Sequence, residues 1–223
     1  MKFSFIKGLV FSLTIVLLMG TTVVASADSV SGTLTVDNAF NLYLSTSPTV
    51  QGTLVTSGGN WFSPVSFSGV TLTPGTTYYL QVQAFNTTEW AGVLGSFSLS
   101  GSGFEFANGS QSLDTDTTDW SVSTAGFGAS FNTPVSQGIN DGSTFPWATY
   151  NPGPSNGIDQ NAEWIWDRTT LVGDGAETDY FETKITPSSN VTTTPEPGTL
   201  LLLGTGLLGF AGIARRKFGK KTA

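Results

Sequence analysis

Residues 76–85, TTYYLQVQAF, decide the fold class, because their side chains alternate between two faces. One face carries Tyr78, Leu80, Val82 and Ala84, and the other carries Tyr79, Gln81, Gln83 and Phe85. A repeat of two residues is the period of a β-strand, and an apolar row opposite a mixed row indicates one buried side. The segment therefore predicts a half-buried strand.

Short alternating runs recur along the chain between turn-forming residues. They are FNLYL (40–44), SFSLSGSGFEF (96–106), EWIWD (163–167) and YFETKIT (180–186). Pro74-Gly75, Asn108-Gly109 and Asp141-Gly142 supply turn chemistry between such runs. We find no segment of helical period and useful length between residues 28 and 186. The pattern predicts an all-β chain with a single antiparallel β-sandwich at residues 28–186.

The predicted sandwich is strongly acidic. Residues 28–186 hold fifteen acidic residues against only Arg168 and Lys184, a net charge of −13. Because affinity for nucleic acid depends on Lys and Arg, we expect no nucleic-acid partner. The chain has no cysteine and no histidine, which excludes disulfides, His-dependent catalytic triads and histidine zinc sites.

The beginning of the chain has the pattern of a secretory signal peptide. Lys2 and Lys7 are followed by an apolar run at residues 9–19 and by Ala25-Ser26-Ala27. The run is too short to span a bilayer, and Ala25 and Ala27 are the small residues that signal peptidase requires. We expect residues 1–27 to be removed by cleavage after Ala27.

The end of the chain combines three features in a fixed order. A Ser/Thr-rich linker at residues 187–194 precedes Pro195-Glu196-Pro197, and an uncharged Leu- and Gly-rich stretch follows. Arg215, Arg216 and Lys217 come directly after it. A helix at about residues 198–214 would cross a membrane, and the basic residues would hold its end in the cytoplasm. The β domain would then lie outside the cell.

These features resemble the PEP-CTERM sorting signal, over about residues 195–223. The same tail is also known as an ice-binding protein C-terminal domain, a name that implies no ice binding. The resemblance implies recognition by an exosortase, a membrane-embedded peptidase that cleaves near Pro195-Glu196-Pro197. The two prolines keep Glu196 extended and outside the helix, as a protease needs. The alternative is an ordinary single-pass anchor with an accidental Pro-Glu-Pro.

The β domain also resembles the galactose-binding-like jelly roll. The similar segments are VDNAFNLYLS (36–45), residues 72–99, AEWIW (162–166) and TDYFETKI (178–185). The resemblance implies a non-catalytic carbohydrate-binding module. This sequence departs from the family pattern where Glu182 follows Phe181, because the family carries a basic residue there. A fibronectin-like sandwich is the competing interpretation, since LTPGTTYYLQV (72–82) suits both.

Aromatic residues supply the candidate ligand site. Residues 132–156 are irregular and rich in proline, which forbids a central strand there. Trp147 and Tyr150 in this loop, with Trp164 and Trp166, are candidates for stacking against sugar rings. The alternative is that the loop aromatics pack across one end of the sandwich.

Acidic residues offer a candidate calcium site and an argument about catalysis. Asp114, Asp116 and Asp119 lie close in sequence, but they lack the glycine and terminal glutamate of an EF-hand loop. The alternative is a solvated surface, so we expect no obligatory cofactor.

A glycosidase needs only two carboxyl groups, and among fifteen acids no spacing singles out a pair.

Together these patterns predict an exported bacterial protein and not an enzyme. We expect it to be anchored in the membrane during sorting and then to lie at the cell surface or in the extracellular matrix. Its expected role is a non-catalytic module that associates with extracellular polysaccharide. The alternatives are a purely structural surface protein without a ligand and, third, a secreted glycosidase.

Overall fold

The computed structural model describes residues 27–87, 89–150, 157–170, 175–189 and 204–206. Of the predicted signal-peptide site, Ala27 is exposed and Ala25 lies outside the described residues. The Pro-Glu-Pro motif (195–197), the basic residues 215–217 and most of the predicted membrane helix at 198–214 also lie outside them. Within the described part of the chain, no helix is long and apolar enough to cross a membrane.

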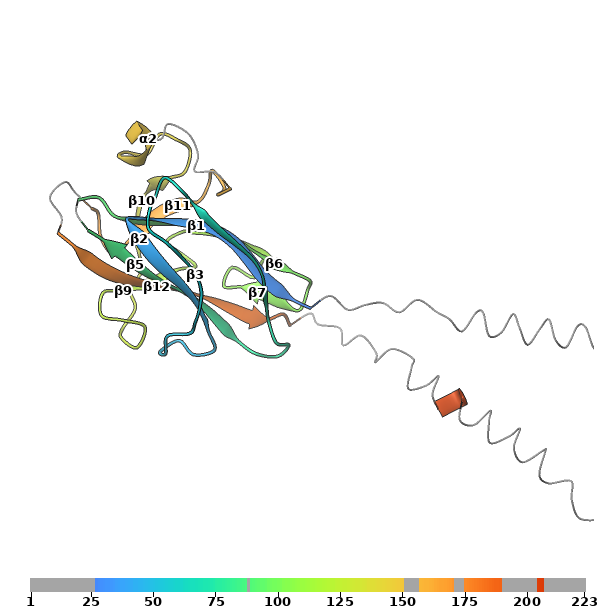
Figure 1. The fold of residues 1–223 in the computed structure, drawn as a ribbon. Helices are drawn as coiled ribbons and strands as arrows, with labels where there is room; N and C mark the ends of the chain where they lie inside the picture. Colours follow the sequence, from blue (N-terminus) through green and yellow to red (C-terminus); the bar gives the residue numbers. More distant parts are fainter. Residues whose placement is uncertain (1–26, 88, 151–156, 171–174, 190–203, 207–223) are drawn as a thin grey trace, which may run out of the picture.

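The described residues form two antiparallel sheets and almost no helix, so the all-β prediction is confirmed (Figure 1). The elements are β1 (Ser29–Asp37), β2 (Ala39–Ser45), β3 (Thr53–Gly58), β4 (Val65–Thr71), β5 (Tyr78–Asn86), β6 (Gly92–Ser100), β7 (Phe104–Phe106), β8 (Ser112–Asp114), β9 (Ser121–Ser123), β10 (Val135–Ile139), α2 (Trp147–Tyr150), β11 (Glu163–Trp166) and β12 (Glu177–Pro187). Sheet A has the order β10-β11-β6-β1-β4, with β8 on β6, and sheet B has the order β3-β2-β5-β12-β7, with β9 on β12.

Residues 78–85 of the segment TTYYLQVQAF lie in β5, at the centre of sheet B. This strand pairs with β2 on one side and with β12 on the other. The predicted apolar row of β5 is buried, as the alternation indicates. The opposite row differs from expectation at Gln81, which is fully buried. The loop before β3 covers it, and the backbone N–H of Gly52 donates to the Gln81 side-chain oxygen.

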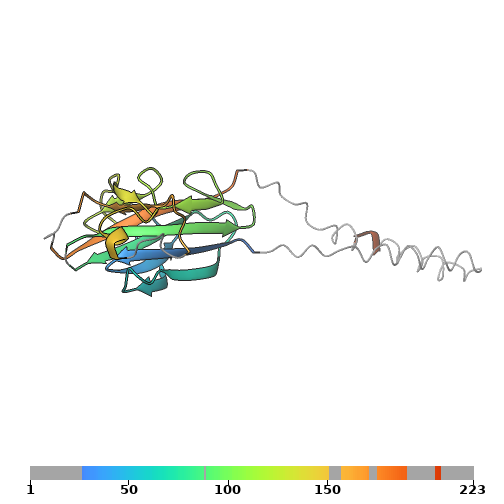
Figure 2. The ribbon, with the colours of Figure 1, turned by 90° about the horizontal axis from the view of Figure 1, so that it is seen from above.

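Both sheets contribute to one hydrophobic core. It contains Leu34 and Val93 of sheet A together with Leu42, Leu80 and Phe181 of sheet B, and all five side chains have no exposed surface. Burying an aliphatic or aromatic side chain of this size stabilises a fold by about 1.5–3 kcal/mol. In Figure 2 the strands run along the length of the domain. This shared core is the main source of stability in a chain without disulfides.

The first and last strands meet at one end of the domain (Figures 1 and 2). The backbone N–H of Gly103 donates to the Asp28 carboxylate at 3.4 Å, and the N–H of Ser188 donates to the Gly103 carbonyl at 2.9 Å. Residues just before β1 and just after β12 are therefore held by one glycine. α2 lies toward the opposite end, so that end points away from both chain connections.

The proline-rich segment 132–156 contains one strand that the sequence did not reveal. β10 begins directly after Pro134 and forms an outer strand of sheet A. No central strand was expected in this segment, and β10 lies at the edge of sheet A. Proline is tolerated directly before an edge strand.

Candidate functional site

The predicted aromatic site residues lie mainly inside the protein. Trp147 and Trp164 stack face to face, with ring centroids 4.1 Å apart and planes inclined by 4°. Only 3% and 2% of their surfaces are exposed. They form a second apolar cluster with Leu94 and Ile158, on the outer face of sheet A. These two indoles stack on each other and offer no open ring face to a sugar.

The Trp147 indole N–H has a buried partner. It donates a hydrogen bond to the Asp37 carboxylate at 3.0 Å, and the Asn38 side-chain amide donates to the other Asp37 oxygen at 2.7 Å. Burial raises the pKa of Asp37 to about 6, and the hydrogen bond from Trp147 opposes that rise. The contact fixes α2 against the end of β1 and is structural in character.

Trp166 is also enclosed, and Tyr150 is the last residue of α2. The Trp166 indole N–H donates to Glu177 at 2.8 Å, and its ring contacts Phe181. Of the four predicted ligand-binding aromatics, the structure therefore brings Trp147 and Trp164 together and places Trp166 elsewhere in the core. The Tyr150 side chain lies outside the described part.

The three predicted calcium-binding aspartates lie close in sequence but do not form a metal site in the structure. One Asp116 oxygen accepts the backbone N–H groups of Thr118 and Asp119, so this carboxylate closes its own turn. Asp114 is half-buried at the end of β8. Among the residues that the structure describes, no group of three acidic side chains could hold a metal ion.

The outer face of sheet B carries a set of neutral polar side chains that fits ligand binding better. We call it the amide–phenol face and define it by Asn41, Tyr43, Gln83 and Tyr180. The Gln83 side-chain oxygen accepts from the Tyr43 hydroxyl at 3.2 Å and from the Asn41 amide at 3.5 Å. The Gln83 amide donates to the Tyr180 hydroxyl at 3.5 Å. Gln83 is thus the centre of the network.

Strand register brings these residues together. Gln83 on β5 lies opposite Asn41 on β2 and opposite Tyr180 on β12. The ring of Phe127 packs edge-on against Tyr43 and Tyr180, at 6.2 and 5.1 Å between centroids. Asn41, Gln83 and Tyr180 are partly exposed, whereas Tyr43 is buried. The face therefore combines fixed rings with polar atoms that solvent can reach.

A carboxyl group lies beside this face. The Gln81 amide donates to Glu182 at 2.9 Å, and burial raises the pKa of Glu182 to about 7. A shallow groove of about 370 Å³ is lined by Glu182, Asp119, Lys184 and Trp120, among others. The groove is open, and its volume lies at the lower end of the range for small-molecule sites.

Sequence reasoning had the signal for the amide–phenol face but did not use it. The mixed row of TTYYLQVQAF contains Gln83, and the FNLYL and YFETKIT runs contain Tyr43 and Tyr180. Antiparallel pairing of these runs was the missing information, because residues opposite each other share a face. The tryptophans chosen as candidates from the sequence, Trp147, Trp164 and Trp166, are buried in the structure.

The comparison with protein families concerns the end of the chain. Residues 193–217 match the PEP-CTERM protein-sorting motif. Neither the curated proteins nor the solved structures contain a match to the chain. The predicted sorting signal is thereby confirmed, and it indicates an exported protein that is anchored in the membrane during sorting. The chain carries a PEP-CTERM protein-sorting motif at residues 193–217, which indicates an exported protein sorted by an exosortase.

Proposed function

We propose that the β domain is the cargo of this sorting signal and acts at the cell surface or in the extracellular matrix as a non-catalytic module that binds uncharged polysaccharide. The amide–phenol face is the observation that carries the proposal. Amide and phenol groups both donate and accept hydrogen bonds, as sugar hydroxyls do. Of the three rings at this face, Tyr43 and Phe127 are buried, whereas Tyr180 is partly exposed. An accessible tyrosine ring suits the apolar side of a sugar.

The charge of the domain narrows the ligand class. With a net charge of −13 over residues 28–186, the domain repels anionic polymers. None of the four residues that define the amide–phenol face carries a charge. A neutral glycan therefore fits the face better than an acidic one.

The fold supports the same role. Two sheets that share one core are compatible with the predicted sandwich, and the jelly-roll architecture includes lectin domains. Both chain connections leave at one end, near Gly103. A tether at that end leaves the sheet faces free while the protein is anchored.

Binding can be tested with the full chain in affinity electrophoresis through gels containing dextran or galactan, with alginate as the acidic comparison. We expect retardation by a neutral polysaccharide. Gln83→Ala and Tyr180→Phe should each weaken binding by about tenfold, the effect of losing about 1.4 kcal/mol of hydrogen bonding.

Ser98→Ala is the matched control, because Ser98 is exposed on β6 in the other sheet. It should leave retardation unchanged. If no neutral polysaccharide retards the folded protein, or if all three variants behave like the original, the ligand-binding proposal is wrong. The alternative, a structural surface protein with no discrete ligand, would then be favoured, since the face already satisfies part of its own hydrogen bonding.

A further inference from the structure

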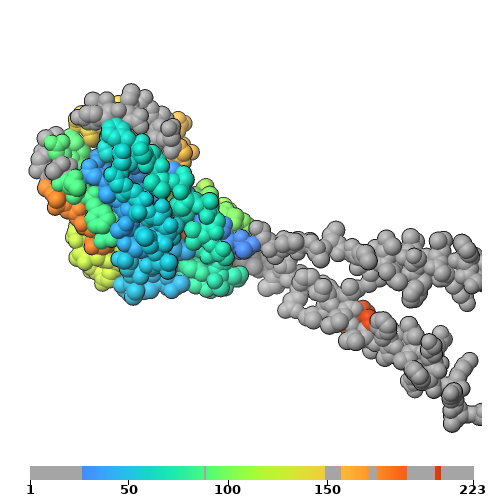
Figure 3. Space-filling model, viewed as in Figure 1, coloured from blue at the N-terminus to red at the C-terminus, as the bar shows by residue number. Residues whose placement is uncertain are grey.

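One long segment of this chain contains no charged residues. Residues 38–88 contain no Asp, Glu, Lys, Arg or His, although the rest of the domain is densely acidic. This segment supplies β2, β3, β4 and β5. It makes up most of the face turned toward the viewer in Figure 3, coloured blue to green. One side of an acidic molecule is therefore electrically neutral.

Two unprotected strand edges lie on this neutral side. β3 ends sheet B and β4 ends sheet A, and the two strands lie next to each other. Within the described residues, neither has a strand partner on its outer edge. Proteins usually protect such edges with charged side chains, because free backbone groups invite pairing with another chain.

The opposite edges of the sheets lie beside acidic residues. In sheet A, Ile139 of β10 lies opposite Glu163 of β11. In sheet B, β7 is only three residues long and contains Glu105. Acidic side chains are thus present at these edges, whereas β3 and β4 contain none.

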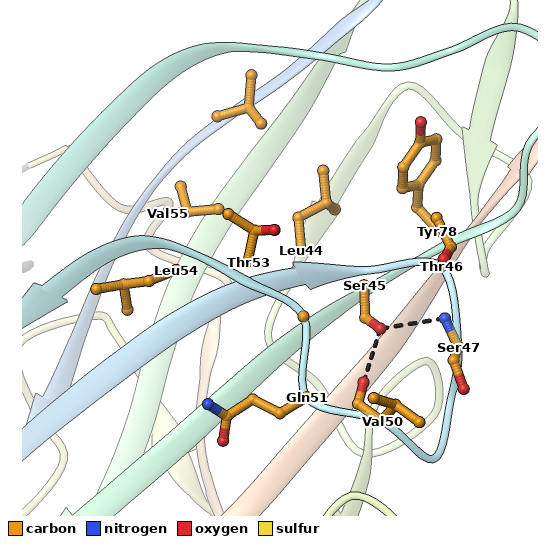
Figure 4. Close-up of a pocket in the computed structure, with 12 residues that line it drawn as sticks. Leu44, Ser45, Thr46, Ser47, Val50, Gln51, Thr53, Leu54, Val55 and Tyr78 are labelled. Carbon is orange, nitrogen blue, oxygen red and sulfur yellow. Dashed lines mark hydrogen bonds between the residues drawn. The ribbon is translucent and has the colours of Figure 1, made fainter.

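A groove between β3 and β4 opens into the core. Its volume is about 760 Å³, and Leu44, Val55, Val70 and Tyr78 line it from both sheets. Figure 4 shows Leu44, Val55 and Tyr78 pointing to one side of the β2–β3 pair and Leu54 pointing away. Val50 and Leu54, beside the groove, are 61% and 54% exposed. Large apolar side chains at an unpaired edge indicate a contact surface.

We propose that the β3–β4 side is a self-association surface, occupied by a second copy of this chain. This inference is independent of polysaccharide binding. Two domains of net charge −13 repel each other wherever their acidic surfaces meet, and residues 38–88 provide a side on which they can meet without that repulsion. The same edge on both copies can pair about a two-fold axis, which gives a closed dimer.

The absence of cysteine allows a direct test. In the full chain, purified in a mild detergent, single substitutions Thr53→Cys, Leu54→Cys and Ser57→Cys place a thiol on exposed positions of β3. Any disulfide must then join two molecules. Paired antiparallel strands bring Cα atoms to about 4.5–5.5 Å, within the range for a disulfide.

The matched controls are Val135→Cys, Ser136→Cys and Ile139→Cys, at exposed positions on the opposite edge strand β10, which lies outside the uncharged segment. We expect mild oxidation to give covalent dimers from at least one β3 variant and in much lower yield from the β10 variants. Equal yields from both strands, or no dimer from any β3 variant, would overturn the proposal.

A second measurement does not depend on disulfide geometry. Light scattering on the full chain should show a dimer, and Leu54→Lys should weaken it by about tenfold or more, because a charge is placed in the contact. Ile139→Lys should leave the dimer unchanged. A folded protein that is monomeric at every concentration is the contrary result.

Discussion

At the scale of single residues, Gly92 is required by the stacked indoles beside it. A Cβ atom at this position would lie 2.8 Å from a Trp164 ring carbon and 3.0 Å from a Trp147 ring carbon. Two parallel rings held by the rest of the fold cannot move apart without losing their own contact. The small residue at the start of β6 is therefore part of the aromatic packing.

We expect Gly92→Ala to lower the free energy of unfolding by about 1–3 kcal/mol, the usual cost of overpacking a core. Urea denaturation followed by tryptophan fluorescence measures this change. Gly59→Ala is the matched control, since a Cβ there meets no atom within 4 Å. Equal stability of the two variants would contradict the packing described here.

Asp179 makes stability depend on pH. It is 1% exposed, and burial, followed by repulsion from Asp167 and Glu177, raises its pKa from 3.8 to about 8. The folded state therefore favours the protonated carboxyl. Its contribution to stability is complete below about pH 4 and is lost as the pH rises to about 8. Burial also raises the pKa values of Asp37 and Glu182.

Asp179→Asn should flatten the fall in the free energy of unfolding between pH 4 and pH 8, because the amide has no proton to lose. Urea denaturation at a series of pH values tests this. Asp141→Asn is the control: hydrogen bonds from Ser143 lower the pKa of Asp141, so its contribution changes only at acidic pH. If the slope above pH 5 is the same in Asp179→Asn and in the original protein, Asp179 does not have the raised pKa.

At the scale of elements, several strands could be predicted from the sequence, whereas β10 and the amide–phenol face could not. Alternation in residues 76–85 identified β5 and its buried row, because period two is a local property. Burial of Gln81 depends on the loop before β3, and the Asn41–Gln83–Tyr180 alignment depends on pairing across three strands. Such contacts join residues far apart in the chain, so no local pattern contains them.

The short helix α2 depends on one side chain. Trp147→Phe keeps a ring beside Trp164 but removes the N–H donor to Asp37. We expect Trp147→Phe to lower the free energy of unfolding by about 1–3 kcal/mol when Asp37 is ionised, because a buried carboxylate then lacks a hydrogen bond. The loss should grow as the pH rises through about 6, the pKa of Asp37.

Urea denaturation at two pH values, below and above 6, measures the effect of Trp147→Phe. Trp90→Phe provides a comparison, since Trp90 is only partly buried and contacts the exposed ring of Phe145. A loss that does not change with pH would mean that the ring, and not the hydrogen bond to Asp37, holds α2 in place.

At the scale of the whole molecule, the domain is arranged for attachment at one end. Asp28 and Ser188 both bond to Gly103, so the segments before β1 and after β12 begin at the same place. The sorting motif at residues 193–217 follows only a few residues after β12. Removal of residues before Asp28 or after Ser188 would leave every strand of the described domain intact.

We predict that the β domain is exported and then released from its sorting tail. Intact-mass spectrometry of the protein recovered from cell-bound and released fractions of its host tests this most directly. We predict a mass for a chain that begins at Asp28 and ends near Pro195-Glu196-Pro197, with or without an added group. A mass that still contains residues 215–223 would contradict the account and identify the tail as a permanent anchor.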